Sequence, residues 1–340
     1  MSIKKLLGML LAALLTGSLV AADIALNPDH PDRYVVVRGD TLWDISARFL
    51  RDPWMWPEVW YVNPQVGNPH LIYPGDVLNL VYVDGQPRIQ VSRDGRLSPR
   101  IREESLENAI PTIPLDAIKQ FLSRVLVVDE GELEAAPYVV QSADEHVITG
   151  AGDRVYVRGI DSNDVALFDI YEPGGAYIDP DTDELLGYEA IFVGTGPVQR
   201  FGDPATIKLT KTTREVRVGD RLLPADRSEP AAYFQPHATP PGTDGHIISV
   251  LDGVTQIGQF SVVALDLGER DGIEIGHVMR VFQRGNVIRD TVSNKYSDTV
   301  RLPDEDAGLV MVFRTYEKVS FGLVMKAHRA IHINDFVRSP

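Results

Sequence analysis

The 340-residue sequence predicts a multidomain α+β protein, in which a small βααβ module is followed by a predominantly β C-terminal region with an internal duplication. Three observations predict this fold class. The length suits two or three domains. Apolar residues at helical spacing follow Thr41, and short β-type runs alternate with glycine turns from Tyr138 onward.

Residues 1–22 have the pattern of a secretory signal peptide. Lys4 and Lys5 precede an apolar run, and small residues follow at Ala21 and Ala22. The alternative is a single membrane anchor, but the run of about 15 residues is shorter than the ~20 that a spanning helix needs. We therefore expect cleavage after Ala22 and export to the periplasm.

The order strand, helix, helix, strand is predicted for residues 34–83. Residues 34–37 are β-rich, and Thr41 is a suitable N-cap for a helix whose apolar residues follow at near-helical spacing. Residues 58–61 predict a second helix, which Asn-Pro then ends. A Pro-Gly-Asp turn leads into the last strand at residues 77–83.

Composition divides the rest of the chain. Residues 84–110 form a charged linker, residues 111–223 a middle domain that passes from α/β to β-rich, residues 224–243 a proline-rich linker or loop, and residues 244–340 a β-rich C-terminal domain. The middle domain is expected to begin with a helix, because four apolar residues have helical spacing: Ile118, Phe121, Leu122 and Val125.

The region after Tyr138 shows signs of two similar β units. Residues 150–159 resemble residues 272–281, because in both a glycine turn precedes a β-type run. Two further pairs of segments follow in the same order: 189–195 with 308–315, and 215–224 with 330–340. The sequence therefore predicts an internal duplication with units of about 60 to 70 residues.

Charge and cysteine content exclude several classes of function. The formal net charge is −15, which disfavours binding to nucleic acid because that binding depends on Lys and Arg neutralising phosphates. The chain has no cysteine, so disulfides, thiolate zinc sites and a cysteine nucleophile are excluded.

No constellation in the sequence predicts catalysis. His328 and His332 have the i, i+4 spacing of zinc ligands but lack an adjacent glutamate, and they lie in a predicted strand. His237 and His246 flank the proline-rich segment without a partner pattern, and His277 is interpreted as a packed or surface residue. We expect no catalytic residue, no metal and no cofactor.

Residues 34–81 resemble the LysM family. The resemblance rests on YVVVRGDTLWDIS from Tyr34, on Asn63-Pro64, and on LIYPGDVL from Leu71. It implies two antiparallel strands with two helices on one face. It also implies binding to N-acetylglucosamine-containing chains, in peptidoglycan or chitin.

The resemblance places the glycan groove between the loop after the first strand and the loop before the last. A shallow groove of backbone donors and acceptors with a few apolar side chains suits a neutral amino-sugar. Leu42 and Ile72 are expected to form its floor. The implied glycan-binding residues are Gly39, Asp40, Thr41, Leu42, Asn68, His70, Leu71, Ile72 and Tyr73.

The helical part of this module is longer and richer in tryptophan than the simplest family pattern. A module without disulfides or metal needs a well-filled core, so we assign Trp43 and Trp60 to that core. For Trp54 and Trp56, a place in the core and stacking on a sugar both stay open.

The whole chain resembles the secretin-associated LysM proteins of type IV pilus systems, and its C-terminal region resembles flagellar outer-membrane ring proteins. Residues 253–260 and 267–279 carry this resemblance. It implies a tether that holds peptidoglycan and an outer-membrane secretin oligomer, whose many subunits would multiply weak glycan contacts. The alternatives are a peptidoglycan hydrolase or hydrolase activator, and a flagellar or general envelope scaffold.

Overall fold

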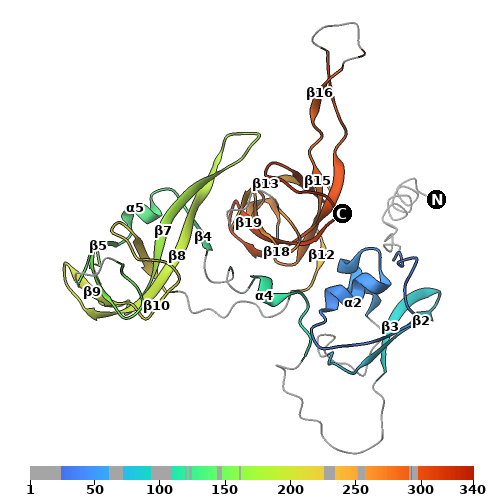
Figure 1. The fold of residues 1–340 in the computed structure, drawn as a ribbon, viewed down its shortest axis with the longest axis horizontal. Coiled ribbons are helices and arrows are strands. Elements are labelled where there is room, and N and C mark those ends of the chain that lie inside the picture. Colours follow the sequence, from blue (N-terminus) through green and yellow to red (C-terminus); the bar gives the residue numbers. More distant parts are fainter. Residues whose placement is uncertain are drawn as a thin grey trace, which may run out of the picture.

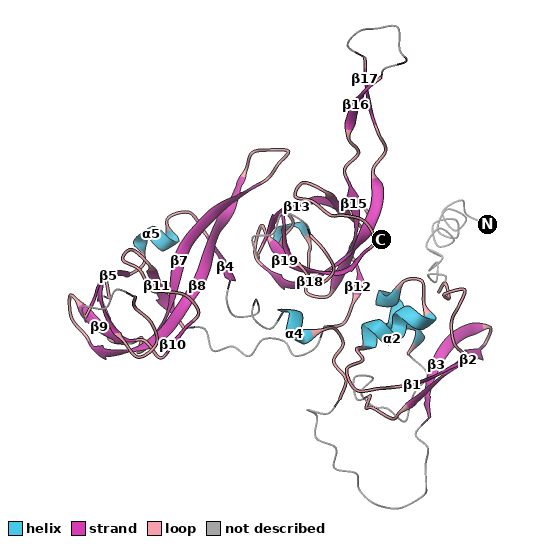
Figure 2. Cartoon of the chain, viewed as in Figure 1, coloured by secondary structure: helices cyan, strands magenta, loops and turns pink. Residues whose placement is uncertain are grey.

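The structure, a computed structural model, describes residues 24–60, 72–92, 109–118, 121, 125–143, 148–160, 162–225, 234–251, 257–290, 292 and 298–340. Strands dominate, and the described helices are short (Figure 2). Figure 1 shows three parts, in which the C-terminal strands lie between the N-terminal module and the middle strands. No helix among the described residues has the length and apolar character needed to cross a membrane.

The N-terminal module combines a three-stranded antiparallel sheet, in the order β1-β2-β3, with short helical segments. Its elements are β1 (Arg33–Val35), α2 (Leu42–Phe49), the 3-10 helix η1 (Pro53–Met55), α3 (Trp56–Val59), β2 (Val77–Val83) and β3 (Gln86–Ser92). One face of α2 buries Leu42, Ile45 and Phe49, as their spacing predicts. These side chains form the core of the module with residues from β2 and β3.

Two predictions for this module need correction. Residues 84–110 are predicted to be a linker, but residues 86–92 form β3, whose alternating buried positions cover the module's core. The second helix is predicted over residues 58–61, but α3 begins at Trp56, directly after η1. Proline at the first turns of both segments favours this earlier start.

The middle strands close into a ring. They are β5 (Tyr138–Ser142), β6 (Arg154–Arg158), β7 (Leu167–Ile178), β8 (Leu185–Arg200), β9 (Ala205–Lys208), β10 (Lys211–Thr212) and β11 (Arg221–Pro224), preceded by β4 (Val125–Val128) and α5 (Glu132–Ala135). β5, β6, β9, β8, β7 and β11 pair in that order, and β11 pairs again with β5. We call this ring the middle barrel, and its interior is apolar.

The C-terminal strands close into a second ring, the C-terminal barrel. They are β13 (Asp244–Val250), β14 (Val262–Leu265), β15 (His277–Gln283), β18 (Glu305–Thr315), β19 (Ser320–Ala327) and β20 (Phe336–Arg338). β12 (His237–Ala238) adds in parallel to β15, and η3 (Glu269–Asp271) lies between β14 and β15. β16 (Val287–Arg289) and β17 (Thr299–Arg301) form a hairpin that projects from the barrel (Figure 1).

The two barrels have the same pairing order. With the strands numbered along the chain within each ring, both rings read 1-2-5-4-3-6, and the last strand pairs with the first. β8 and β18 both take the fourth place, and β11 and β20 both take the sixth, which agrees with two of the predicted segment pairs. β6 takes the second place and β15 the third, so the predicted match of residues 150–159 with 272–281 is wrong. The duplication itself stays a prediction.

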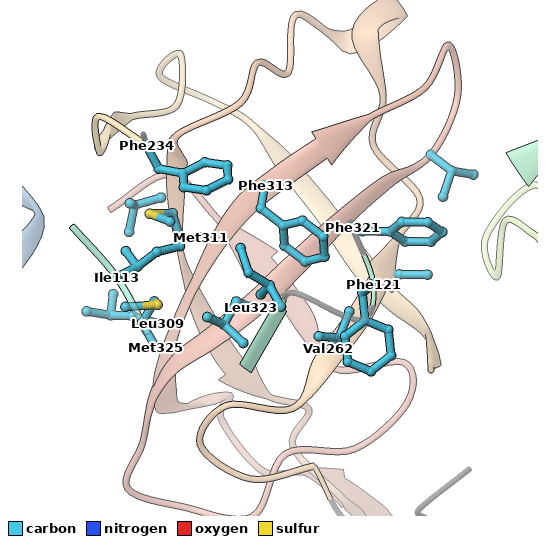
Figure 3. Packing of buried hydrophobic residues seen from close by; sticks show 14 of the residues in the cluster. Ile113, Phe121, Phe234, Val262, Leu309, Met311, Phe313, Phe321, Leu323 and Met325 are labelled. Carbon is cyan, nitrogen blue, oxygen red and sulfur yellow. The ribbon is translucent and has the colours of Figure 1, made fainter. Parts of the chain in front are cut away.

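The outer face of the C-terminal barrel carries a second apolar layer (Figure 3). Four strands contribute its barrel side: β14, β15, β18 and β19. Side chains from the rest of the chain cover it: Trp43, Ile113, Ile118, Phe121, Tyr177, Leu186 and Phe234. We call this set the outer-face cluster, and we call residues 109–118 the connector. The barrel is therefore packed on both sides, against the middle barrel's β7–β8 hairpin and against the connector and the N-terminal module.

Two predictions for the connecting segments differ from the structure. The predicted helix with apolar residues from Ile118 to Val125 is limited to α4 (Leu115–Ile118), and Val125 already begins β4; Leu122 lies outside the described residues. Within the predicted linker 224–243, Phe234 is buried in the outer-face cluster and β12 pairs with β15. Pairing of β4 with β8 of the middle barrel and contacts of Ile118, Phe234 and β12 with the C-terminal barrel decide these outcomes, and local sequence does not contain them.

Candidate functional site

The loop before α2 is held by side chains that satisfy its backbone. The Thr41 hydroxyl accepts a hydrogen bond from Asp44 N–H at 3.1 Å and donates to the Asp44 carboxylate at 2.8 Å. Asp40 Oδ2 accepts from Val37 N–H and from the Tyr34 hydroxyl, each at 2.9 Å. Burial and the Asp40 carboxylate raise the pKa of the Tyr34 hydroxyl. The loop is therefore fixed before any ligand arrives.

A similar turn holds the opposite edge, just before β2. Asp76 Oδ2 accepts a hydrogen bond from Tyr73 N–H at 3.1 Å, and Gly75 has a φ of 98° that favours glycine. Two backbone hydrogen bonds with Val36, at 2.9 and 2.8 Å, join this turn to the loop after β1. The two edges therefore form one rigid frame, with Leu42 on one side and Ile72 on the other.

The space between these edges is occupied by the connector. Leu42 N–H donates to Pro111 C=O and Trp43 N–H donates to Thr112 C=O, both at 3.0 Å. From the other edge, Ile72 C=O accepts from Ile110 N–H at 2.8 Å. The first N–H groups of a helix have no partner within the helix, so those of α2 are satisfied here by the connector's carbonyls. The frame thus binds peptide amides through both donors and acceptors.

A cavity of about 960 Å³ adjoins this contact. Side chains and backbone of both edges line it, and the connector and one residue of the C-terminal barrel complete it. The lining residues are Arg38, Gly39, Asp40, Thr41, Asp44, Tyr73, Pro74, Ala109, Ile110, Pro111, Pro114, Leu115 and Phe260. Backbone groups, two carboxylates and apolar side chains meet there, a mixture that suits a polar ligand with apolar faces.

Comparison with known proteins identifies the N-terminal module. The LysM domain model matches residues 34–81. This segment is a LysM domain. A LysM domain implies binding to peptidoglycan or a related carbohydrate, and it is a binding domain without catalytic chemistry of its own.

A stretch of 60 residues is 35% identical to an uncharacterized protein, YqbP, of Bacillus subtilis (strain 168). The match covers 15% of this chain and 27% of that protein. The chain thus spans about a quarter of the relative's length.

The structure brings some of the sequence-predicted glycan-binding residues together. Gly39, Asp40, Thr41 and Tyr73 line the cavity of the LysM domain. Leu42 and Ile72 do not form an open floor, because their exposed fractions are 2% and 0% and the connector lies against their backbone. Three predicted residues lie outside the described residues: Asn68, His70 and Leu71. Contact with glycan stays a prediction for the whole set.

Sequence reasoning missed the connector and Phe260. Phe260 follows β13 and lines the LysM cavity. It is at least 186 residues away in sequence from the LysM residues of that cavity, so no local signal could place it there. The connector residues were equally hidden, because nothing in their spacing relates them to the groove. Of the missed LysM residues, Arg38 and Asp44 adjoin the predicted loop and could have been found by extending it.

The tryptophans of the LysM domain are packed inside the protein. Trp56 and Trp60 lie in the domain core with ring centroids 6.4 Å apart, which confirms the core assignment of Trp60 and places Trp56 beside it. Trp54 is half-buried between this core and the outer-face cluster. Trp43 is buried as predicted, but it packs in the outer-face cluster and not in the domain core. None of the four lines the cavity.

A second cluster brings together His237, Glu274 and His277, with ligand atoms within 4.8 Å of one another. His277 Nδ1 accepts a hydrogen bond from Glu274 N–H at 3.0 Å, so the neutral ring carries its hydrogen on Nε2. That ring then has no lone pair left for a metal ion. Burial and the neighbouring His237 lower the pKa of His277, which favours this neutral form. The cluster is accounted for by packing between β12 and β15.

Proposed function

We propose that this protein is a non-enzymatic tether: its LysM domain binds the glycan of peptidoglycan, and its C-terminal region holds an outer-membrane secretin channel of a type IV pilus system. One observation carries the glycan part. The N–H groups of Leu42 and Trp43 and the C=O of Ile72 converge on secondary amides of the connector. The acetamido group of N-acetylglucosamine is also a secondary amide, with one acceptor and one donor, so the same frame suits it.

The hydrogen bonds of the two aspartates beside the groove support binding without bond cleavage. Asp40 and Asp44 are engaged by the loop's own backbone and by Thr41, so they hold the loop in shape. The frame offers hydrogen-bonding groups and apolar contacts, which orient a sugar but do not activate water. We expect no clearing of peptidoglycan in a zymogram of the purified protein.

The pattern of residues 1–22 supports export to the periplasm, where peptidoglycan and an outer-membrane channel both lie within reach. The shared pairing order of the two barrels supports their origin from one duplicated unit. The projecting β16–β17 hairpin supports contact with a partner, because Val287, Ile288 and Val300 are exposed on it at 64%, 44% and 45%.

Cosedimentation with purified sacculi tests the glycan part. The mature chain should pellet with the sacculi, and the chain lacking residues 34–81 should stay in solution. Retention of the deleted chain would contradict the proposal. As a second arm, chitin oligomers should compete with the sacculi, whereas cellulose oligomers of equal length, which lack the acetamido group, should not.

In-cell crosslinking tests the secretin part. A photoreactive amino acid at Val300, on the projecting hairpin, should crosslink to the channel. One at Ile148, which is exposed at 68% on the middle barrel, is the matched control. Recovery of a flagellar ring component in place of the secretin would support the alternative scaffold and overturn this part of the proposal.

A further inference from the structure

The connector occupies the groove that the LysM resemblance assigns to glycan. Its three backbone hydrogen bonds use both edges of the frame, and its Ile110 side chain, exposed at 6%, packs into the core cluster of the LysM domain. This contact is built from the chain itself, within one molecule. The connector's peptide amides resemble the acetamido group of N-acetylglucosamine, so connector and glycan suit the same hydrogen-bonding groups of the groove.

Glycan and connector cannot both use these groups. Leu42 N–H and Trp43 N–H each carry one hydrogen, and each already donates it at 3.0 Å to a connector carbonyl. A sugar oxygen could accept from them only after Pro111 and Thr112 move away. If the connector left and nothing replaced it, the helix N-terminus would lose its partners at a cost in free energy. Exchange of one amide for another avoids that cost.

We propose that residues 110–112 are a built-in occupant of the LysM groove, which glycan displaces when it binds. This inference rests on the proposed glycan function and adds a regulation to it. Only molecules whose groove is free can bind glycan, so the apparent affinity for glycan equals the intrinsic affinity multiplied by the fraction of such molecules.

Displacement also changes the relation between the LysM domain and the C-terminal barrel. The next connector residue, Ile113, is fully buried in the outer-face cluster, beside Trp43. A connector that leaves the groove is therefore still held by the barrel, while the LysM domain loses three hydrogen bonds that dock it there. Wall binding in this way loosens the LysM domain from the barrel without detaching the chain.

The test measures the affinity of the full mature chain for an N-acetylglucosamine pentamer by isothermal titration. Ile110→Thr removes apolar atoms that hold the connector in place. Val91→Thr is the matched control, because Val91 is exposed at 7%, lies in the same core cluster, and belongs to β3 and not to the connector. We expect Ile110→Thr to bind about tenfold more tightly than the native chain, and Val91→Thr to bind like it.

Amide hydrogen exchange gives a second readout that does not depend on substitution. On saturation with the pentamer, the Ile110 amide should exchange faster, because it loses Ile72 C=O, while the Leu42 and Trp43 amides should stay protected by the sugar. Unchanged protection of Ile110 in the complex, together with equal affinities of the native chain and Ile110→Thr, would overturn the inference and leave the glycan function standing. Failure of every variant to bind the pentamer and muropeptides would overturn both.

Discussion

One turn recurs at the residue scale in all three parts of the protein. In this turn an aspartate side chain accepts a hydrogen bond from the N–H of the residue three positions before it. The residue directly before the aspartate has a positive φ. The aspartates are Asp40, Asp76, Asp153, Asp220 and Asp335, preceded by Gly39, Gly75, Gly152, Gly219 and Asn334. In the LysM domain these turns form both edges of the groove, and in each barrel one of them leads into the last strand.

Thr41 links local capping to the groove. Thr41→Ala removes the oxygen that accepts from Asp44 N–H, so we expect a loss of about 1 kcal/mol in the free energy of unfolding of the LysM domain. Thr41→Ser keeps the hydroxyl and should stay within a few tenths of the native value. Urea unfolding followed by tryptophan fluorescence reports on the LysM domain and on its contact with the C-terminal barrel, because all four tryptophans lie between residues 43 and 60 and Trp43 packs in the outer-face cluster. Equal stability of both variants would contradict the capping role.

Asp220 should make stability depend on pH. Burial raises the pKa of its carboxyl from 3.8 to about 6, so the protonated form is favoured in the folded state. The stabilising contribution of the protonated Asp220 carboxyl is complete below pH 3.8 and is lost as pH rises through about 6. The native chain should therefore lose roughly 2 kcal/mol relative to Asp220→Asn between pH 4 and pH 7. Urea unfolding at both pH values measures this difference in free energy of unfolding. Asp164→Asn, at an exposed position, is the control, and the native chain should not lose stability relative to it between the same pH values.

At the element scale, the sequence predicted what local chemistry decides. The cap at Thr41 and the buried face of α2 follow from spacing within eight residues, and the glycine turns mark most strand ends. β3 was missed because its charged neighbours obscured the alternation of buried positions. The occupied groove could not be predicted, because Ile110 meets Ile72 through a backbone contact that no side-chain pattern records.

The β18–β19 hairpin depends on close contact between two backbones. A Cβ at Gly308 in β18 would collide with the carbonyl oxygen of Lys326 in β19. Gly308→Ala should therefore lower the free energy of unfolding by about 1–3 kcal/mol, measured by urea unfolding with circular dichroism. Gly258→Ala is the control, because a Cβ there meets nothing within 4 Å, and it should stay within about 0.5 kcal/mol of the native chain. A neutral Gly308→Ala would show that the hairpin can open at this position.

At the scale of the whole molecule, ion pairs hold both neighbours of the C-terminal barrel. Glu184, at the tip of the β7–β8 hairpin, lies 2.7 Å from Arg270 and 2.8 Å from Lys318, and these cations lower its pKa to about 2. On the other side, Arg280 of β15 lies 2.8 Å from Asp52 of the LysM domain. Each ion pair lies beside the apolar outer-face cluster. The ion pairs therefore set the orientation of the two neighbouring parts, while burial of the apolar side chains supplies the binding free energy.

The pair between Asp52 and Arg280 should therefore control docking of the LysM domain. In Arg280→Glu a carboxylate faces Asp52 and Asp306, and the repulsion should move the domain from the barrel. Trp43 would then leave the outer-face cluster, so we expect a red shift of tryptophan emission and a larger radius of gyration in small-angle scattering. Arg289→Glu, on the projecting β16, makes the same charge change away from the LysM domain and should leave both values unchanged. Adding Asp52→Arg to Arg280→Glu restores opposite charges and should reverse the shift in part. An unshifted emission in Arg280→Glu would mean that the outer-face cluster and the connector dock the domain without help from this pair.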